Sequence, residues 1–329
     1  MVGICDNVEQ GVMAVSKELL VLIDYEVDVL ETFREMASEY QLVSEFEEAD
    51  FSKVEIVLGW DERLVDVLES GQHQLKWIQL STAGVDKLPL DLLAQEGVRL
   101  TSASGMHTHS LAESIFGMLL ARTRGILQSV EASKASRWAQ EEIEPVVLFD
   151  KSVTIIGAGK IGTEVAHMAK AFGMKTTGVN RSGGQIDGFD KVYTNDNLAE
   201  AVADADVIIN ILPLTPETTG LFNLSLFKQF KPGAIFVNVG RGESVVTADL
   251  LTALDQELLS FAALDVFEEE PLPAESPVYT HSKILATPHI AGFMDDYLGT
   301  LRPIIEENLQ AFIDREELPV SEVDLERKY

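Results

Sequence analysis

The most constraining feature of the chain is a glycine pattern, Gly157-Ala158-Gly159-Lys160-Ile161-Gly162, which follows the apolar run SVTII and precedes the helical segment TEVAHMAKAFG. In such a pattern the first glycine permits a tight turn, the second lets backbone approach a pyrophosphate, and the third lets helix pack on strand. The helix N-terminus then faces the phosphate charge. We therefore predict a dinucleotide site. A phosphate-loop NTPase is excluded because Thr163, not lysine, follows the last glycine.

Short apolar runs alternate with helical patterns along most of the chain. Near the N-terminus the runs are ELLVLID, VEIVLG, LKWIQLS and VRLT, and from Ser152 a second series follows the glycine pattern with KTTGVN, DVIINILPL, AIFVNVGRG, FAALDVF and KILATPHI. This alternation is typical of parallel sheets covered by helices. At 329 residues the chain is long enough for two cores. We expect an α/β fold with two Rossmann-like or flavodoxin-like parallel-sheet domains.

Helices are expected at 26–40 and 61–71, the second ending at Gly71, and in a long amphipathic segment that starts at Ser110. Glu113, three residues after Ser110, predicts a capping box there. Residues 1–12 are expected to form a loose extension.

Composition excludes several function classes. With 54 acidic and 25 basic residues the formal charge is −29, which disfavours nucleic acid and anionic membrane as partners. The single cysteine, Cys5, excludes an intramolecular disulfide and a multi-cysteine zinc site, and we expect no metal and a cytoplasmic location. The first 16 residues resemble neither a secretory signal nor a membrane span.

The end of the run after the glycine pattern bears on cofactor choice. NAD-selective members of this fold place an acidic residue there to bind the ribose 2′-hydroxyl. This chain has Asn180-Arg181-Ser182 instead, so no carboxylate repels a 2′-phosphate, and Arg181 and Ser182 could bind one. We therefore favour NADP(H) over NAD(H). The alternative is that Arg181 stacks on adenine or points to solvent.

Three ionisable residues follow the glycine pattern at strand ends or in loops. They are Arg241 in VNVGRGE, Glu270 in ALDVFEEEPLP and His289 in ATPHIAG. Ligands of open α/β sheets bind at the carboxyl ends of strands, where these residues are expected. Each one alone also has an ordinary structural explanation.

Taken together and in this order, VNVGRG, LDVFEEEPLP and TPHIAG resemble the D-isomer-specific 2-hydroxyacid dehydrogenases, a family that includes phosphoglycerate, D-lactate and glyoxylate/hydroxypyruvate dehydrogenases or reductases. STAGVD at 81–86, SLAESIFGMLLA from Ser110 and LPLTPET at 212–218 also look like family motifs. The resemblance covers nearly the whole chain. It points to a member similar to glyoxylate/hydroxypyruvate reductase or D-lactate dehydrogenase.

The resemblance implies that Arg241, Glu270 and His289 are the catalytic set of an oxidoreductase. Hydride would pass between NAD(P)H and C2 of a small 2-keto or D-2-hydroxy acid, with His289 as acid and base. Glu270, if paired with His289, would favour the imidazolium and orient the ring. Arg241 would bind the substrate carboxylate and polarise the carbonyl.

The resemblance also assigns binding roles. Backbone amides around Ala83 and Gly84 would hold the substrate carboxylate as a nest. Asp265 would position the nicotinamide carboxamide, and Leu212, Pro213 and Thr218 would line the cofactor. His107 and His109 are interpreted as loop residues.

Domain organisation follows from the family pattern. Residues 1–102 plus 291–329 would form the substrate domain and 103–290 the nucleotide domain, with the active site in the cleft between them. A final helix from about Asp295 to Asp314 would return to the first domain. The resemblance further implies a homodimer, whose interface we would seek between Arg124 and Leu148, near Trp138.

Two alternative functions remain open. Family relatives include corepressors that bind dinucleotide without catalysis, so a non-catalytic NAD(P) sensor is the main alternative. A formate dehydrogenase is a weaker alternative, because the insertions usual in that enzyme are not evident.

The substrate side chain is expected near Gly59, Trp60, Trp77, Phe293 and Met294. These positions carry no cation, which disfavours phosphoglycerate, and the last two favour an apolar group. Glyoxylate, hydroxypyruvate, pyruvate and branched 2-keto acids remain open.

Overall fold

The computed structural model describes residues 17–327, which divide into two compact units. We call them the terminal unit, residues 17–104 and 298–327, and the central unit, residues 105–297. The unit boundaries lie at 104/105 and 297/298, which is two and seven residues after the predicted domain boundaries at 102/103 and 290/291. Which unit binds which ligand stays a prediction. The predicted extension at 1–12, with Cys5, lies outside the described residues.

The terminal unit is built on a five-stranded parallel sheet of order β2-β1-β3-β4-β5, the flavodoxin-like order. Its strands are β1 (Lys17–Val21), β2 (Tyr40–Val43), β3 (Val54–Leu58), β4 (Trp77–Gln79) and β5 (Arg99–Thr101). Its helices are α1 (Val27–Met36), α2 (Leu64–Ser70), α3 (Leu90–Gln95) and nearly all of α10 (Tyr297–Arg315), with a short 3-10 turn, η1 (Phe46–Glu48). As predicted, α2 ends at Gly71, whose φ of 61° is left-handed.

A buried polar network joins the sheet of the terminal unit to α10. The Trp77 indole donates to the Thr101 hydroxyl at 2.7 Å, and Gln79 Oε1 accepts from both Thr101 and Asn308. Trp77 is fully buried and packs on Phe312, with ring centroids 5.3 Å apart. The expectation that Trp77 lines a substrate pocket is therefore wrong, because its ring belongs to this core.

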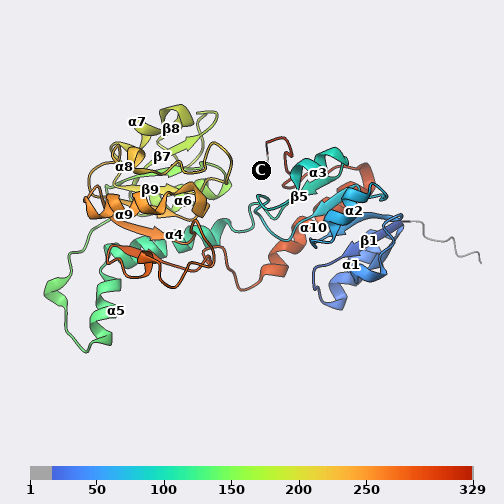
Figure 1. The fold of residues 1–329 in the computed structure, drawn as a ribbon, viewed down its shortest axis with the longest axis horizontal. Coiled ribbons are helices and arrows are strands. Elements are labelled where there is room, and N and C mark those ends of the chain that lie inside the picture. The colour runs from blue at the N-terminus through green and yellow to red at the C-terminus, as the bar shows by residue number, and fades with distance from the viewer. Residues whose placement is uncertain (1–16, 328–329) are drawn as a thin grey trace, which may run out of the picture. The chain divides into compact units, whose positions relative to one another are not determined.

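The central unit is built on a seven-stranded parallel sheet of order β12-β11-β10-β9-β6-β7-β8, which contains the Rossmann order (Figure 1). Its strands are β6 (Ser152–Ile156), β7 (Lys175–Asn180), β8 (Lys191–Thr194), β9 (Val207–Asn210), β10 (Ala234–Asn238), β11 (Leu259–Leu264) and β12 (Ile284–Ala286). Its α-helices, apart from the first residue of α10, are α4 (Thr108–Thr123), α5 (Ile126–Lys134), α6 (Lys160–Ala171), α7 (Leu198–Val202), α8 (Leu224–Phe227) and α9 (Thr247–Asp255). Short 3-10 turns are η2 (Gln140–Glu142), η3 (Asn195–Asn197), η4 (Gly242–Ser244) and η5 (Pro277–Tyr279).

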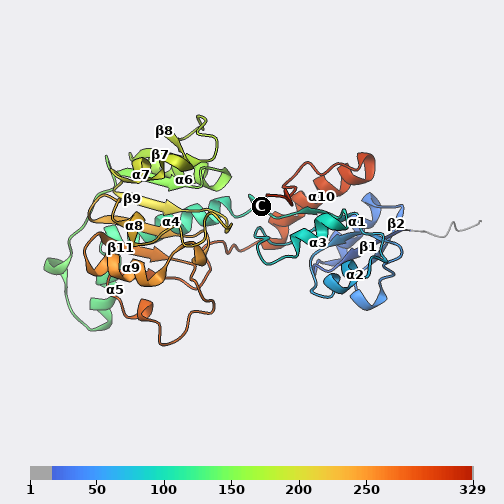
Figure 2. The same ribbon diagram turned by 45° about the horizontal axis from the view of Figure 1, so that its top comes forward.

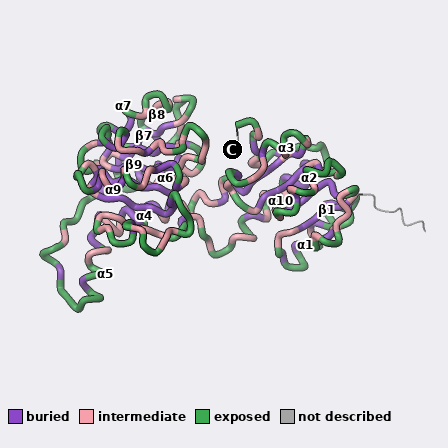
Figure 3. The backbone as a smooth tube through the Cα atoms, viewed as in Figure 1, coloured by how far each residue is buried: buried purple, intermediate pink, exposed green. Residues whose placement is uncertain are grey.

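Separate cores cover the two faces of the central sheet. Helices α4 and α6 pack over one face, and α7, α8 and α9 over the other. Strands such as VIIN and AIFVN are buried along their whole length, as parallel strands covered on both faces require (Figure 3). The predicted α/β class with two parallel sheets is confirmed.

The long amphipathic segment predicted from Ser110 is interrupted. It forms α4 and α5, separated at Gly125, whose φ of 70° is left-handed. Helix α5 and the following residues up to about 148, which we call the arm, stand out from the rest of the central unit (Figures 1 and 2). Much of the arm is exposed, including Trp138 at 89%.

The capping box predicted at Ser110 is wrong, because α4 begins earlier, with His107 as its N-cap. The Ser110 hydroxyl instead donates to the carbonyls of His107 and Gly292. Among residues 17–327, no helix is long and apolar enough to cross a membrane.

Candidate active site

The predicted site residues of the central unit gather at one edge of its sheet. The glycine turn follows β6, Asn180 ends β7, and Leu212 lies two residues after β9. Arg241, Asp265 and His289 follow the three adjacent strands β10, β11 and β12. Because all these strands are parallel, their carboxyl ends share one edge, where ligands of open α/β sheets bind.

The three glycines have the geometry that a dinucleotide site needs. Gly157 has a φ of 107°, which other residues rarely adopt. A Cβ at Gly159, the N-cap of α6, would meet nothing within 4 Å, whereas a Cβ at Gly162 would lie 2.5 Å from the Gly157 carbonyl oxygen. The turn therefore leaves open space beside the helix N-terminus, and the residues present fit a pyrophosphate.

At the end of β7, Asn180 organises the turn predicted to recognise the 2′ position. Its Oδ1 accepts from the Gly183 amide at 2.7 Å and from the Ser182 hydroxyl at 3.3 Å. Arg181 and Ser182 are both exposed. A cation and a hydroxyl thus lie accessible in a turn that contains no carboxylate.

The loop after β9 is folded by its own threonines. Thr218 Oγ1 donates to the Pro213 carbonyl at 2.8 Å and accepts from the Thr215 amide at 2.8 Å. The pKa of Glu217 in this loop lies below its usual value, because its own backbone amide and the Thr215 hydroxyl bond the carboxylate. The Thr218 side chain therefore shapes the loop, while Leu212 and Pro213 lie along it.

Arg241 follows β10 in a tightly packed turn. Its side chain is partly buried, and Nη1 donates to the Gly240 carbonyl at 2.9 Å. A Cβ at Gly242 would overlap the backbone of Phe267, so the Arg241 turn packs directly on the loop after β11. Glycine is required there by close approach.

Glu270 and His289 form a direct pair. His289 Nδ1 lies 2.6 Å from Glu270 Oε2, and Glu270 Oε1 accepts from the Phe267 amide at 2.9 Å. The imidazole is 54% exposed and the glutamate side chain 30% exposed. The carboxylate therefore fixes the ring through Nδ1 and leaves Nε2 for another partner.

Asp265 is almost fully buried and binds the loop that carries His289. Its Oδ1 accepts from the Thr287 hydroxyl at 2.6 Å and the Ile290 amide at 2.9 Å, and its Oδ2 accepts from the Ala291 amide at 2.9 Å. The His289 amide donates to the Asp265 carbonyl at 2.8 Å. Asp265 thus orders the residues on both sides of His289.

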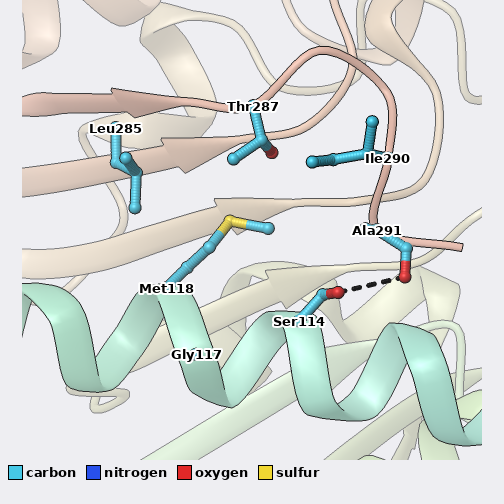
Figure 4. Close-up of a pocket in the computed structure, with 7 residues that line it drawn as sticks. All are labelled: Ser114, Gly117, Met118, Leu285, Thr287, Ile290 and Ala291. Atoms are coloured by element: carbon cyan, nitrogen blue, oxygen red, sulfur yellow. Dashed lines mark hydrogen bonds between the residues drawn. The ribbon is translucent and has the colours of Figure 1, made fainter. Parts of the chain in front are cut away.

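The start of α4 holds the far end of the same loop. His107 Nδ1 lies 2.8 Å from the Gly292 carbonyl, and Ser114 donates to the Ala291 carbonyl at 3.1 Å (Figure 4). The interpretation of His109 as a loop residue is wrong, because it lies in the first turn of α4, where it is exposed and its Nδ1 lies 3.3 Å from Glu164 Oε1. An apolar hollow of about 280 Å³ between α4 and this segment is lined by Ser114, Gly117, Met118, Leu285, Thr287, Ile290 and Ala291. It contains no titratable side chain and offers no chemistry.

Ala83 and Gly84 lie in the terminal unit, in the loop after β4. The Thr82 hydroxyl donates to the Gly84 carbonyl at 3.2 Å, and the Ala103 amide donates to the Thr82 carbonyl at 2.9 Å. None of the described residues 81–86 has a positive φ, so these residues form a turn without a left-handed residue. That the amides of this turn bind the substrate carboxylate stays a prediction.

Sequence reasoning missed three residues that support this site. Asn210, Asn238 and Ser244 are fully buried and hydrogen-bonded to one another in a chain. A signal was present, since VIIN and AIFVN each end a buried apolar run with an asparagine. Within residues 17–327, no cluster of three or more metal-ligating side chains occurs.

Comparison with known proteins identifies the family. The family model of the D-isomer specific 2-hydroxyacid dehydrogenase, NAD binding domain, matches residues 116–291. The chain belongs to this dehydrogenase family. It is an oxidoreductase that transfers hydride between a nicotinamide dinucleotide and a small 2-hydroxy or 2-keto acid.

Individual relatives agree with the family. Glyoxylate/hydroxypyruvate reductase A of Photorhabdus laumondii is 38% identical over 59% of this chain and 60% of its own. The structure of a D-isomer specific 2-hydroxyacid dehydrogenase family protein from Aeromonas salmonicida is 35% identical, with a TM-score of 0.80, over 94% of this chain and 99% of its own. The NADPH-dependent glyoxylate/hydroxypyruvate reductase of Sinorhizobium meliloti, solved with NADP and sulfate, is 27% identical, with a TM-score of 0.79, over 95% of this chain and 100% of its own.

Proposed function

We propose that this dehydrogenase reduces a small 2-keto acid with NADPH, using His289 as the acid and base. The observation that carries the proposal is the pair in which Glu270 Oε2 lies 2.6 Å from His289 Nδ1. The pair orients an exposed imidazole at the carboxyl edge of the sheet, where a nicotinamide cofactor would supply or accept the hydride. No observation on the described residues supports the non-catalytic sensor.

The proton chemistry follows from this pairing. When Nδ1 donates to Glu270, the remaining nitrogen of His289, Nε2, is the one that can exchange a proton with substrate. In reduction Nε2 gives a proton to the developing alkoxide, and in oxidation it takes the hydroxyl proton. The neighbouring carboxylate stabilises the imidazolium that exists on one side of each step.

Substrate binding is assigned to Arg241 and to the amides around Ala83 and Gly84. The Arg241 guanidinium is always charged and can bind a carboxylate through two parallel hydrogen bonds. Its charge would also stabilise the negative charge that develops on the carbonyl oxygen. The amides of the turn after β4 would donate to the carboxylate as a small nest.

For the cofactor, we assign the pyrophosphate to the turn at Gly157, Gly159 and Gly162, with Lys160 and Ile161 opening the helix. Asn180, Arg181 and Ser182 would recognise the 2′-phosphate, since the turn presents a cation and a hydroxyl and no repelling carboxylate. The name of the Sinorhizobium reductase supports NADPH. Leu212, Pro213 and Thr218 would flank the cofactor.

Glyoxylate and hydroxypyruvate are the substrates we favour. Both similar reductases carry these substrates in their names. Phe293 is 73% exposed and follows the His289 loop, so an apolar side chain on the substrate would also be tolerated there.

The arm is proposed as the contact with a second copy of the chain. In the arm, Trp138 is 89% exposed and Val147 is 61% exposed. Exposed apolar side chains gathered on a projecting segment favour association. Light scattering of the wild type and of Trp138→Asp tests the homodimer, which the substitution should weaken.

We propose the cytoplasm as the compartment of this protein. The single cysteine of the chain is compatible with a reducing compartment.

The decisive experiment follows absorbance of the reduced nicotinamide with a panel of 2-keto acids, offered with NADPH and separately with NADH. We expect NADPH oxidation with glyoxylate or hydroxypyruvate. His289→Ala should abolish turnover and leave cofactor binding nearly unchanged, whereas Arg181→Ala should weaken NADPH binding and spare NADH. Full activity of His289→Ala would refute its role. No turnover by the wild type across the panel would favour the sensor.

A further inference from the structure

The backbone around Arg241 is held by buried side chains that have no place in the chemistry described above. We propose that Asn210 and Ser244 are positioning residues for Arg241. By holding the main chain of Arg241, they set the affinity for the substrate carboxylate. This inference rests on the proposed function, because it assigns them the task of holding the substrate-binding arginine.

Asn210, at the end of β9, is bonded through both atoms of its amide. Its Nδ2 donates to Asn238 Oδ1 and to Ser244 Oγ, each at 2.9 Å, and its Oδ1 accepts from the Leu212 amide at 3.1 Å. The backbone amide can only donate, which fixes the orientation of the side-chain amide. Asn210, which is fully buried, therefore connects the loop after β9 to the turn after β10.

The other end of this chain of bonds is the Arg241 carbonyl. It accepts from the Ser244 hydroxyl at 2.6 Å and from Asn238 Nδ2 at 3.1 Å. On the other side of Arg241, the Gly240 amide donates to Asn238 Oδ1 at 3.1 Å. The peptide group after Arg241 and the Val239–Gly240 peptide group are thus both held by the same small network.

Close packing leaves this turn little room to move. A Cβ at Gly240 would lie 2.7 Å from the Leu212 carbonyl oxygen, so the two loops touch through their backbones. Burying polar side chains costs free energy unless all their groups are bonded. Here every polar atom of the Asn210 side chain has a partner, in the loop after β9, at the end of β10 or in the turn that follows β10.

The network affects the position of the Arg241 guanidinium. The Arg241 side chain is anchored at its main chain, so a displacement of the main chain moves the charged group as well. A misplacement of about 1 Å can lower a rate roughly a hundredfold. The network therefore acts on substrate affinity through the position of Arg241.

The first test is Ser244→Ala, which removes one donor to the Arg241 carbonyl and keeps the small volume. The KM for glyoxylate should rise about tenfold, as expected for one lost hydrogen bond, while the Kd for NADPH stays unchanged. Asn210→Asp keeps the shape and removes both N–H donors. It should raise the KM further, while NADPH binding stays nearly unchanged, because the oxygen that accepts from the Leu212 amide is retained.

A matched control separates positioning from simple stability. Thr154 is a buried residue of the same unit whose hydroxyl donates to the Ala201 carbonyl at 2.7 Å. Thr154→Val should lower the melting temperature about as much as Ser244→Ala and leave the KM unchanged. In an Arg241→Ala background, Ser244→Ala should have no further effect on kcat/KM.

The outcomes are distinguishable. If the wild type reduces no 2-keto acid, the proposed function fails. If the wild type is active and Ser244→Ala has the same KM, or if its effect persists in the Arg241→Ala background, the positioning role is overturned.

Discussion

The glycine turn after β6 allows folding and cofactor binding to be separated by two single-methyl substitutions. In Gly162→Ala the new Cβ lies 2.5 Å from the backbone oxygen of Gly157, which cannot rotate away. Overpacking of this kind costs about 3 kcal/mol at its upper end, while alanine in a helix regains about 1 kcal/mol over glycine. The net loss is then about 2 kcal/mol, which lowers the melting temperature of a unit of this size by roughly 4–8 °C.

Gly159→Ala is the matched variant, since its Cβ meets nothing within 4 Å and its φ of −102° suits alanine. It should keep the wild-type melting temperature but fill the space beside the N-terminus of α6, and so weaken cofactor binding at least tenfold. Calorimetric unfolding and titration with NADPH measure the two effects. A Gly162→Ala protein as stable as wild type, or a Gly159→Ala protein with unchanged cofactor affinity, would refute this division of roles.

Three further outcomes are expected. Asp265→Asn should lower kcat about tenfold with NADPH affinity retained, because an N–H group replaces a carboxylate oxygen that accepts from the His289 loop. A kcat equal to that of the wild type would contradict this role of Asp265. Glu270→Gln should lower kcat/KM roughly a hundredfold and alter its pH profile, since the amide orients the ring but no longer stabilises its charge. The pKa of Asp61 is lowered from 3.8 to about 2 by hydrogen bonds from Arg63. Its stabilisation is present above pH 4 and lost towards pH 2, so Asp61→Asn should flatten the fall of the melting temperature over that range.

Of the described strands, the sequence missed two, β2 and β8. Each lies at one edge of its sheet, and its residues include exposed and partly buried ones. An edge strand contacts a neighbour on one side only, so no continuous apolar run is required of it. The opposite edge strands, β5 and β12, were predicted, because VRLT and KILATPHI carry apolar residues. The apolar run, and not the place in the sheet, therefore decided which edge strands the sequence revealed.

In the candidate site, the sequence predicted the ionisable side chains but not the contacts that hold them in place. Arg241, Glu270 and His289 stood out as ionisable residues at strand ends or in loops, and the family resemblance gave them their predicted roles. The His289–Glu270 contact, at 2.6 Å, joins residues 19 positions apart, and no local pattern specifies that distance. The bonds of Asn210 and Ser244 span 34 positions, and local sequence patterns do not reveal such long-range contacts.

His289 combines an exposed ring with a constrained backbone. Its φ of 55° is left-handed, a conformation that costs a residue other than glycine about 1–3 kcal/mol and persists only where the surroundings enforce it. Asp265 supplies that enforcement through hydrogen bonds from the Thr287 hydroxyl and the amides of Ile290 and Ala291, and bonds to a charged acceptor contribute about 1.5–3 kcal/mol each. These bonds exceed the strain even at their lower limit. The ring can therefore remain 54% exposed, as its proposed proton exchange requires, because its orientation comes from the backbone behind it and from Glu270 rather than from packing around it.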